Sequence, residues 1–121
     1  MHQTNLAEEI NKTKSKNFFV IVEGKNDLHA LVELGFNPKN IFVLKNGKNI
    51  QEDIEFIINE LKKRKQECVI LTDLDSEGKK LYNIIKNELS KEGIKINNFL
   101  RKQLLKEKIS HIEGLATFTL K

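Results

Sequence analysis

The sequence predicts an α/β fold in which a parallel sheet is covered by helices on both faces. Three apolar runs rich in β-branched residues, at 18–22, 41–44 and 68–71, are typical of strands buried on both sides. Amphipathic stretches with helical spacing separate these runs, and this alternation indicates βαβ units. The chain has 121 residues, which is the size of one domain, so we expect a single domain over 1–121.

Helices are expected before, between and after the three strands. Apolar residues recur at helical spacing within 6–10, 28–32, 50–61 and 81–89. The first of these stretches predicts a short N-terminal helix within 1–16. The second and the fourth are soon followed by a glycine, which is a common residue just after a helix C-terminus.

The last third of the chain gives weaker signals. A short alternating run, Ile94–Ile96, predicts a fourth strand, and leucines within 100–105 predict one more helix. The tail from 111 to 121 has no defined pattern. We therefore expect a core over 17–96 and a basic C-terminal extension over 97–121.

Composition excludes several classes of protein. With 39% hydrophobic and 31% charged residues, the chain is typical of a soluble globular protein. No apolar run approaches the roughly 20 residues of a membrane span, and the N-terminus is polar, so we expect a cytoplasmic protein without membrane contact. Cys68 is the single cysteine, which excludes a disulfide framework and a multi-cysteine zinc site.

Charge is unevenly distributed along the chain. Residues 1–78 carry a net charge of −2 and residues 79–121 a net charge of +6. An acidic first part and a basic second part suit a carboxylate site beside a surface that binds phosphates. Solvation of exposed helix faces by lysine explains the same pattern without a ligand.

Carboxylates follow the first and third predicted strands. Glu23 comes directly after the first strand, and Asp73 and Asp75 come directly after the third. Ligands bind beyond the carboxyl ends of parallel strands, and these three side chains converge there if the two strands are neighbours. This requirement predicts the strand order 2-1-3-4, and Gly78 then lets the next helix begin close to the sheet.

A divalent cation would relieve the repulsion among such carboxylates. Mg²⁺ prefers oxygen ligands and is commonly held by one or two carboxylates together with substrate phosphates. A further carboxylate outside the metal's ligand set can act as general acid or base. We therefore expect Mg²⁺ as cofactor, with Mn²⁺ as a substitute.

These motifs resemble the Toprim domain, the family of topoisomerases, primases, small nucleases and recombination proteins. The family carries Glu-Gly after its first strand and Asp-x-Asp after its third. The resemblance covers roughly residues 17–96. The two segments that carry it are Val22-Glu23-Gly24-Lys25-Asn26-Asp27 and Leu71-Thr72-Asp73-Leu74-Asp75-Ser76-Glu77-Gly78. The chain is most similar overall to small stand-alone Toprim proteins of archaea and bacteria.

The resemblance implies a role for each matching residue. Glu23 is then the general acid/base, and Asp73 and Asp75 bind Mg²⁺. Glu77 lies where several members carry another acid and is a further candidate metal ligand. Asn46-Gly47 is similar to a pair found in the small ribonucleases that mature 5S rRNA. The neighbouring residues expected to contact substrate are Gly24, Lys25, Asn46, Gly47 and Gly78.

Two activities of the wider family are not expected. A topoisomerase needs a nucleophilic tyrosine on a separate domain, and Tyr82 lies within a predicted helix of a one-domain chain. Primases and recombination mediators carry zinc modules, which Cys68 alone does not support.

Other interpretations of the same residues fit less well. An EF-hand loop starting at Asp73 would place Ile84 where a bidentate glutamate is required. A phosphatase of the haloacid dehalogenase type needs catalytic residues further downstream than this chain extends. Asp27 and Asp75 also suit helix capping, which is compatible with metal binding at Asp75. The three histidines, His111 among them, are unrelated in spacing and indicate surface or helix positions.

The sequence thus predicts Mg²⁺-dependent cleavage or transfer of phosphodiester bonds in nucleic acid, with RNA favoured over DNA. The basic C-terminal third, with Lys95, Arg101, Lys102, Lys106 and Lys108, would hold the phosphate backbone. The alternative is a non-catalytic Toprim module that binds nucleic acid or regulates a larger complex.

Overall fold

A three-stranded parallel sheet with the order β2-β1-β3 forms the centre of the protein. The computed structural model describes residues 5–45 and 49–117. The elements are α1 (Leu6–Ser15), β1 (Phe19–Val22), α2 (Lys25–Glu33), η1 (Pro38–Asn40), β2 (Ile41–Val43), α3 (Ile50–Arg64), β3 (Cys68–Leu71), α4 (Ser76–Lys91), α5 (Phe99–Lys106) and η2 (Ile112–Thr117). None of the helices in these ranges is long and apolar enough to cross a membrane.

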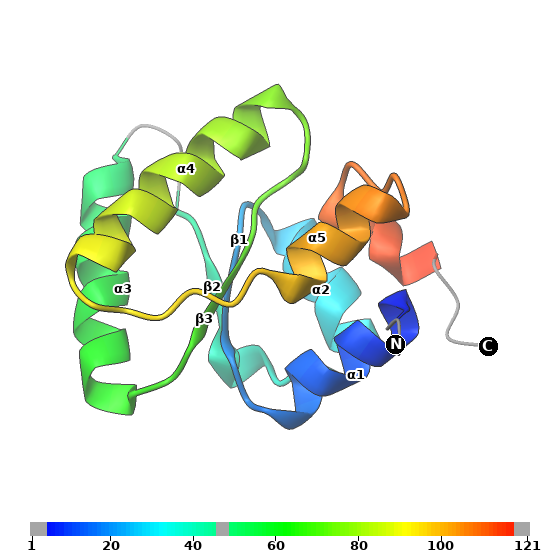
Figure 1. Cartoon of the computed structure of the whole chain (residues 1–121), viewed down its shortest axis with the longest axis horizontal. Coiled ribbons are helices and arrows are strands. Elements are labelled where there is room, and N and C mark those ends of the chain that lie inside the picture. The colour runs from blue at the N-terminus through cyan, green and yellow to red at the C-terminus, as the bar shows by residue number, and fades with distance from the viewer. Residues whose placement is uncertain (1–4, 46–48, 118–121) are drawn as a thin grey trace, which may run out of the picture.

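The sheet separates two hydrophobic clusters. Side chains alternate across a strand, so Val20 of β1 belongs to the cluster that includes residues of α1, α2, α5 and η2, whereas Ile21 belongs to the cluster that includes residues of α3 and α4. Figure 1 shows the same division, with α3 and α4 on one side of the sheet and the other helices opposite. The predicted α/β architecture with helices on both faces is confirmed.

Strand β1 lies between its two partners in register. Val22 pairs with Val43 of β2 and with Leu71 of β3, so the three strands end at the same level. The residues that follow β1 and β3 therefore meet at one edge of the sheet. This is the arrangement that the convergence of Glu23 with Asp73 and Asp75 requires.

The prediction of a fourth strand is wrong. Within the described residues, Ile94–Ile96 contributes a single parallel bridge, between Ile96 and Cys68. Cys68 donates its N–H to Lys95 O and accepts the N–H of Asn97, after which the backbone turns into α5. The segment is too short to form a continuous strand beside β3, because α5 begins at Phe99.

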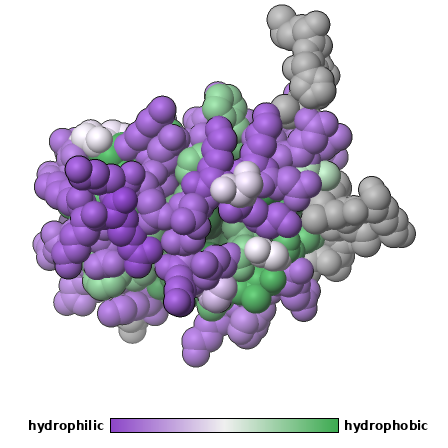
Figure 2. Space-filling model, turned by 90° about the horizontal axis from the view of Figure 1, so that it is seen from below, coloured by the Kyte–Doolittle hydropathy of each residue, from purple (hydrophilic) through white to green (hydrophobic). Residues whose placement is uncertain are grey.

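In the part of the C-terminal segment that the structure describes, η2 contributes to the core, whereas the sequence predicts an undefined tail. Ile112 and Leu115 of η2 are both fully buried in the cluster that includes Leu31 of α2 and Leu104 of α5. Hydrophilic side chains cover most of the surface in the view of Figure 2, with small apolar areas between them. Through Ile112 and Leu115, η2 therefore closes one side of the domain.

Gly78 allows the close approach between α4 and the end of β3. A Cβ atom at this position would lie 1.9 Å from the backbone oxygen of Asp73. Ser76 begins α4 only a few residues after Leu71 ends β3, so the first turn of the helix lies against the connecting loop. The sequence-based expectation of close packing at Gly78 is confirmed.

We predict that Gly78→Ala lowers the free energy of unfolding by about 1–3 kcal/mol, the usual cost of forcing atoms into a packed site. The matched control is Gly114→Ala, whose Cβ would meet only Ile109 Cγ2 at 3.8 Å. Urea unfolding of both variants checks the prediction, and equal stability of the two would contradict it.

Candidate metal centre

The first part of the site is the turn from β1 into α2. Glu23 follows β1 directly and is half-buried. Gly24 is the N-cap of α2, and its N–H donates to Oδ2 of the buried Asp27 at 3.0 Å. Asp27 thus caps the helix, as the sequence suggested, and the short turn places the Glu23 carboxylate at the end of the sheet.

The second part is the loop from β3 into α4. Asp75 is the N-cap of α4, and its Oδ1 accepts the N–H of Gly78 at 2.8 Å. Asp73 Oδ1 accepts the N–H of Ile112 at 3.0 Å. Buried Thr72 donates its hydroxyl to Gly78 O at 2.7 Å, which ties the loop to the helix. Each aspartate therefore uses one oxygen in a backbone hydrogen bond, which fixes the orientation of the other.

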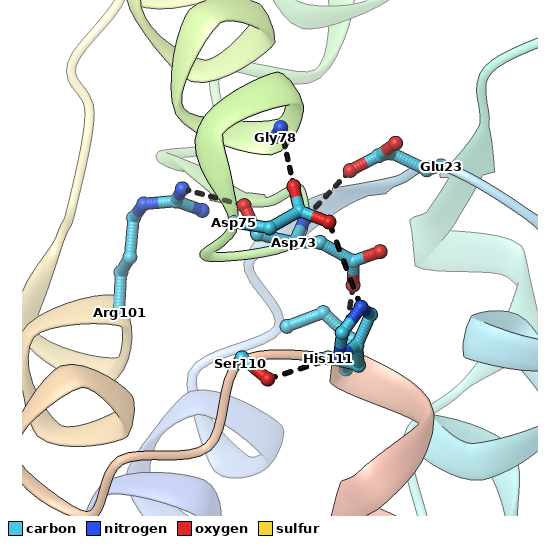
Figure 3. A network of polar contacts seen from close by, with 8 residues as sticks. Glu23, Asp73, Asp75, Gly78, Arg101, Ser110 and His111 are labelled. Carbon is cyan, nitrogen blue, oxygen red and sulfur yellow. Dashed lines mark hydrogen bonds and ion pairs between the residues drawn. The ribbon is translucent and has the colours of Figure 1, made fainter.

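A hydrogen bond joins the two loops. Glu23 Oε2 accepts the backbone N–H of Asp73 at 2.6 Å, although the two residues are 50 positions apart. The contact exists because β1 and β3 are adjacent and end in register. Figure 3 shows the carboxylates of Glu23, Asp73 and Asp75 gathered beside the first turn of α4.

The gathering of carboxylates changes their acidity. Burial raises the pKa of Glu23, and the charges of Asp73, Asp75 and Asp27 raise it further, although the hydrogen bond from the Asp73 backbone acts in the opposite direction. Burial also raises the pKa of Asp27, with a second contribution from the charge of Asp73. Both carboxyl groups therefore hold protons more tightly than exposed carboxyl groups do.

His111 lies beside the two aspartates in the structure, whereas the sequence pattern predicts a surface histidine without a function. Its Nε2 lies 3.5 Å from Asp75 Oδ2, and its Nδ1 lies 2.9 Å from Ser110 Oγ. One ligand atom from each of Asp73, Asp75 and His111 lies within 4.8 Å of the others. No spacing signal connects His111 with motifs nearly 40 residues upstream, so only the fold identifies it.

The donor set fits a divalent cation. Ligand atoms on one ion lie about 3 Å apart when adjacent and about 4.2 Å apart when opposite, because bonds to Mg²⁺-sized ions are about 2.1 Å. The ligand atoms of Asp73, Asp75 and His111 all lie within 4.8 Å of one another, a limit that includes these separations. The side chains of Asp75 and His111 are 45% and 55% exposed, which leaves room for water or substrate beside an ion.

Glu77 does not belong to this group, contrary to the sequence-based prediction. Its side chain is 80% exposed, and it forms an ion pair with Lys80 at 3.7 Å. The reason is local, because α4 begins at Ser76 and the strand-like alternation that aligns Asp73 with Asp75 ends there.

The residues expected to contact substrate have different environments. Lys25 is exposed and lines an open cavity of about 510 Å³ together with Glu23, Gly24 and Asp73. Gly78 is buried, with its N–H bonded to Asp75. The predicted Asn46-Gly47 pair lies outside the described residues.

Arg101 does not face solvent, which corrects its expected role in holding phosphates. It is 5% exposed, and its guanidinium donates to the backbone oxygens of Ile70, Thr72 and Asp73 at 3.3, 2.6 and 3.1 Å. The same group lies 4.3 Å from the ring centroid of Tyr82. Burial lowers the pKa of Arg101, with nearby negative charges opposing the shift. The residue therefore stabilises the loop that carries the aspartates.

We predict that Asp27→Asn flattens the pH dependence of stability in EDTA. Folding raises the pKa of Asp27, which means that the folded state disfavours the charged carboxylate. The protein therefore loses stability as the pH rises through the acidic range and Asp27 ionises. Asparagine keeps an acceptor for Gly24 N–H without the charge, so the variant should exceed wild type in stability at pH 7.

Thermal unfolding between pH 4 and 8 measures the stability of the Asp27→Asn variant. The control is Asp27→Ala, which loses the helix cap at a cost of about 1 kcal/mol. An Asp27→Asn variant with the wild-type pH profile would contradict the electrostatic explanation.

Comparisons with known proteins agree with this geometry. No curated protein sequence matches the chain. A solved structure of a protein from Aquifex aeolicus is 30% identical, with a TM-score of 0.79, over 93% of this chain and 99% of that one. The sequence model of the Toprim-like family matches residues 20–108, which include Glu23, Asp73 and Asp75. The chain therefore belongs to the Toprim-like family.

Proposed function

We propose that this protein is a divalent-metal-dependent enzyme that cleaves phosphodiester bonds in nucleic acid, with RNA favoured over DNA. Toprim domains generally bind divalent metal and act on nucleic acids. The observation that carries the proposal is the convergence of a half-buried glutamate with two aspartates of fixed orientation. Mg²⁺ is the ion predicted from the sequence, and Mn²⁺ would substitute for it.

Asp73 and Asp75 would hold the ion. Each carboxylate has one oxygen fixed by a backbone N–H, from Ile112 and Gly78 respectively, and a ligand atom of each lies near the other. Hydrogen bonds of this kind orient metal ligands, and their loss typically lowers metal affinity by about 10–100-fold. A bound divalent ion supplies Lewis-acid stabilisation of charge on a phosphoryl oxygen.

Glu23 would transfer the proton. Its Oε2 is held by the backbone of Asp73, so Oε1 is the atom left to exchange a proton with a reacting oxygen. Its raised pKa suits general acid–base catalysis near neutral pH better than that of an exposed glutamate. Glu23 lies beside the proposed metal ligands but is not one of them, which supports a role in proton transfer rather than in metal binding.

Phosphates would bind beside Glu23 on the β2 side of the site. Lys25, Lys45 and His29 line an open cavity of about 740 Å³ that also includes Glu23. Lysine ammonium groups bind phosphates as point charges without reading sequence. Backbone-directed binding of nucleic acid is therefore the mode we propose.

The metal centre has a direct thermal test. An ion at about ten times its Kd adds about 1.4 kcal/mol to stability, which raises Tm by about 4–8 °C in a domain near this size. We predict such a shift for wild type with Mg²⁺ or Mn²⁺, and none for the Asp73→Asn/Asp75→Asn double variant. An equal shift in both proteins would mean that the ion binds elsewhere.

The catalytic proposal has a separate test. We predict metal-dependent cleavage within a panel of structured RNA and DNA, with Glu23→Gln at least about 100-fold slower, because general acid–base groups contribute about 10²–10⁴-fold. Glu23→Gln should retain the metal-induced rise in Tm, since Glu23 is not a proposed ligand. The control is Glu55→Gln, an exposed position on α3, which should cleave at the wild-type rate. Salt-sensitive binding without cleavage, unaffected by Glu23→Gln, would instead establish the non-catalytic alternative.

A further inference from the structure

We propose that His111 is the third protein ligand of the metal centre and that its imidazole makes the site prefer a first-row transition ion, from Mn²⁺ to Zn²⁺, over Mg²⁺. This inference rests on the metal centre proposed above and specifies its ligand set. His111 lies beyond residues 20–108, the segment that matches the family model, so the family motif does not assign it.

The backbone around His111 is fixed to the loop that carries the aspartates. On one side of the histidine, Ser110 O accepts the N–H of Leu74 at 2.7 Å. On the other side, Ile112 donates its N–H to Asp73 Oδ1 at 3.0 Å, and the Ile112 side chain is fully buried. His111 thus lies between two residues that are hydrogen-bonded to the aspartate loop, although its own side chain remains half-exposed.

The imidazole ring is also oriented. Ser110 Oγ lies 2.9 Å from Nδ1, and Nε2 is directed at Asp75 Oδ2 at 3.5 Å, as Figure 3 shows. When Nδ1–H donates to the serine hydroxyl, Nε2 presents its lone pair to a carboxylate oxygen. In that tautomer the two electron-rich atoms face each other, and a cation between them would remove their repulsion. An outer partner on one ring nitrogen with the other nitrogen facing carboxylates is the usual arrangement of a metal-binding histidine.

The ligand chemistry determines the preferred ion. Mg²⁺ selects oxygen ligands and retains several waters, whereas first-row transition ions accept imidazole together with carboxylate. A site with two carboxylates and one imidazole therefore gains affinity from the nitrogen only when a transition ion is bound. The Asp73 and Asp75 oxygens alone would bind either kind of ion.

The test compares two ions on the same variants. Co²⁺ binding is followed by its visible spectrum and by calorimetry, and Mg²⁺ binding by calorimetry, in wild type and His111→Ala. We expect wild type to prefer Co²⁺, and we expect His111→Ala to lose at least about tenfold in Co²⁺ affinity, with the spectrum altered. Its Mg²⁺ affinity should stay within about threefold of wild type, because Mg²⁺ selects oxygen ligands. His2→Ala, a histidine outside both sequence motifs, is the matched control and should bind both ions as wild type does.

A measurement on wild type avoids any effect of substitution on folding. In ¹⁵N-imidazole NMR spectra, stoichiometric Zn²⁺ should shift the Nε2 resonance of His111 and leave that of His29 in place. An unshifted His111 resonance, an unchanged Co²⁺ affinity in His111→Ala, or equal loss of Co²⁺ and Mg²⁺ affinity would each overturn the role of His111. Failure of wild type to bind either ion would instead overturn the metal centre itself.

Discussion

The buried guanidinium of Arg101 is the interaction on which the site's geometry depends. It connects α5 to the end of β3 and the loop after it through the oxygens of Ile70, Thr72 and Asp73. Without this donor, three buried or half-buried carbonyls next to the proposed metal ligands would lose a partner, and each such loss costs about 1–3 kcal/mol. Stacking on Tyr82 extends the same contact to α4. A residue outside both sequence motifs therefore holds the aspartate loop in position.

Arg101 also offsets part of the electrostatic cost of the site. The pKa values of Glu23 and Asp27 are raised in part by the charges of neighbouring carboxylates, so the ion-free protein carries a repulsion that folding must overcome. Catalytic groups are commonly placed at such a cost to stability, because the same charges that destabilise the fold bind the cofactor. The Arg101 guanidinium attracts the charges of Glu23 and Asp73, which opposes this repulsion.

Local patterns predict much of the fold, and the failures have physical causes. Continuous β-branched runs identify β1, β2 and β3, and the requirement that Glu23 meet the aspartates gives their order. The false fourth strand arises because Ile94–Ile96 alternates like a strand, but α5 begins too soon for a ladder to form. The sequence predicts the wrong environment for Arg101 and no role for His111 for another reason. The burial of a cation and the approach of a distant histidine depend on tertiary contacts that no spacing encodes.

The position of His111 bears on how the activity of such domains is inferred. The matched segment, 20–108, contains the glutamate and both aspartates, whereas Ser110, His111 and Ile112 lie just beyond it. These three residues contact the aspartate loop through the serine carbonyl, the imidazole and the isoleucine N–H. Two domains with the same motif but different residues after α5 would therefore share a fold and a pair of carboxylates yet present different ligand sets. With His111 as a ligand, the choice of ion would depend on the segment that closes the site, and the motif alone would determine only where an ion binds.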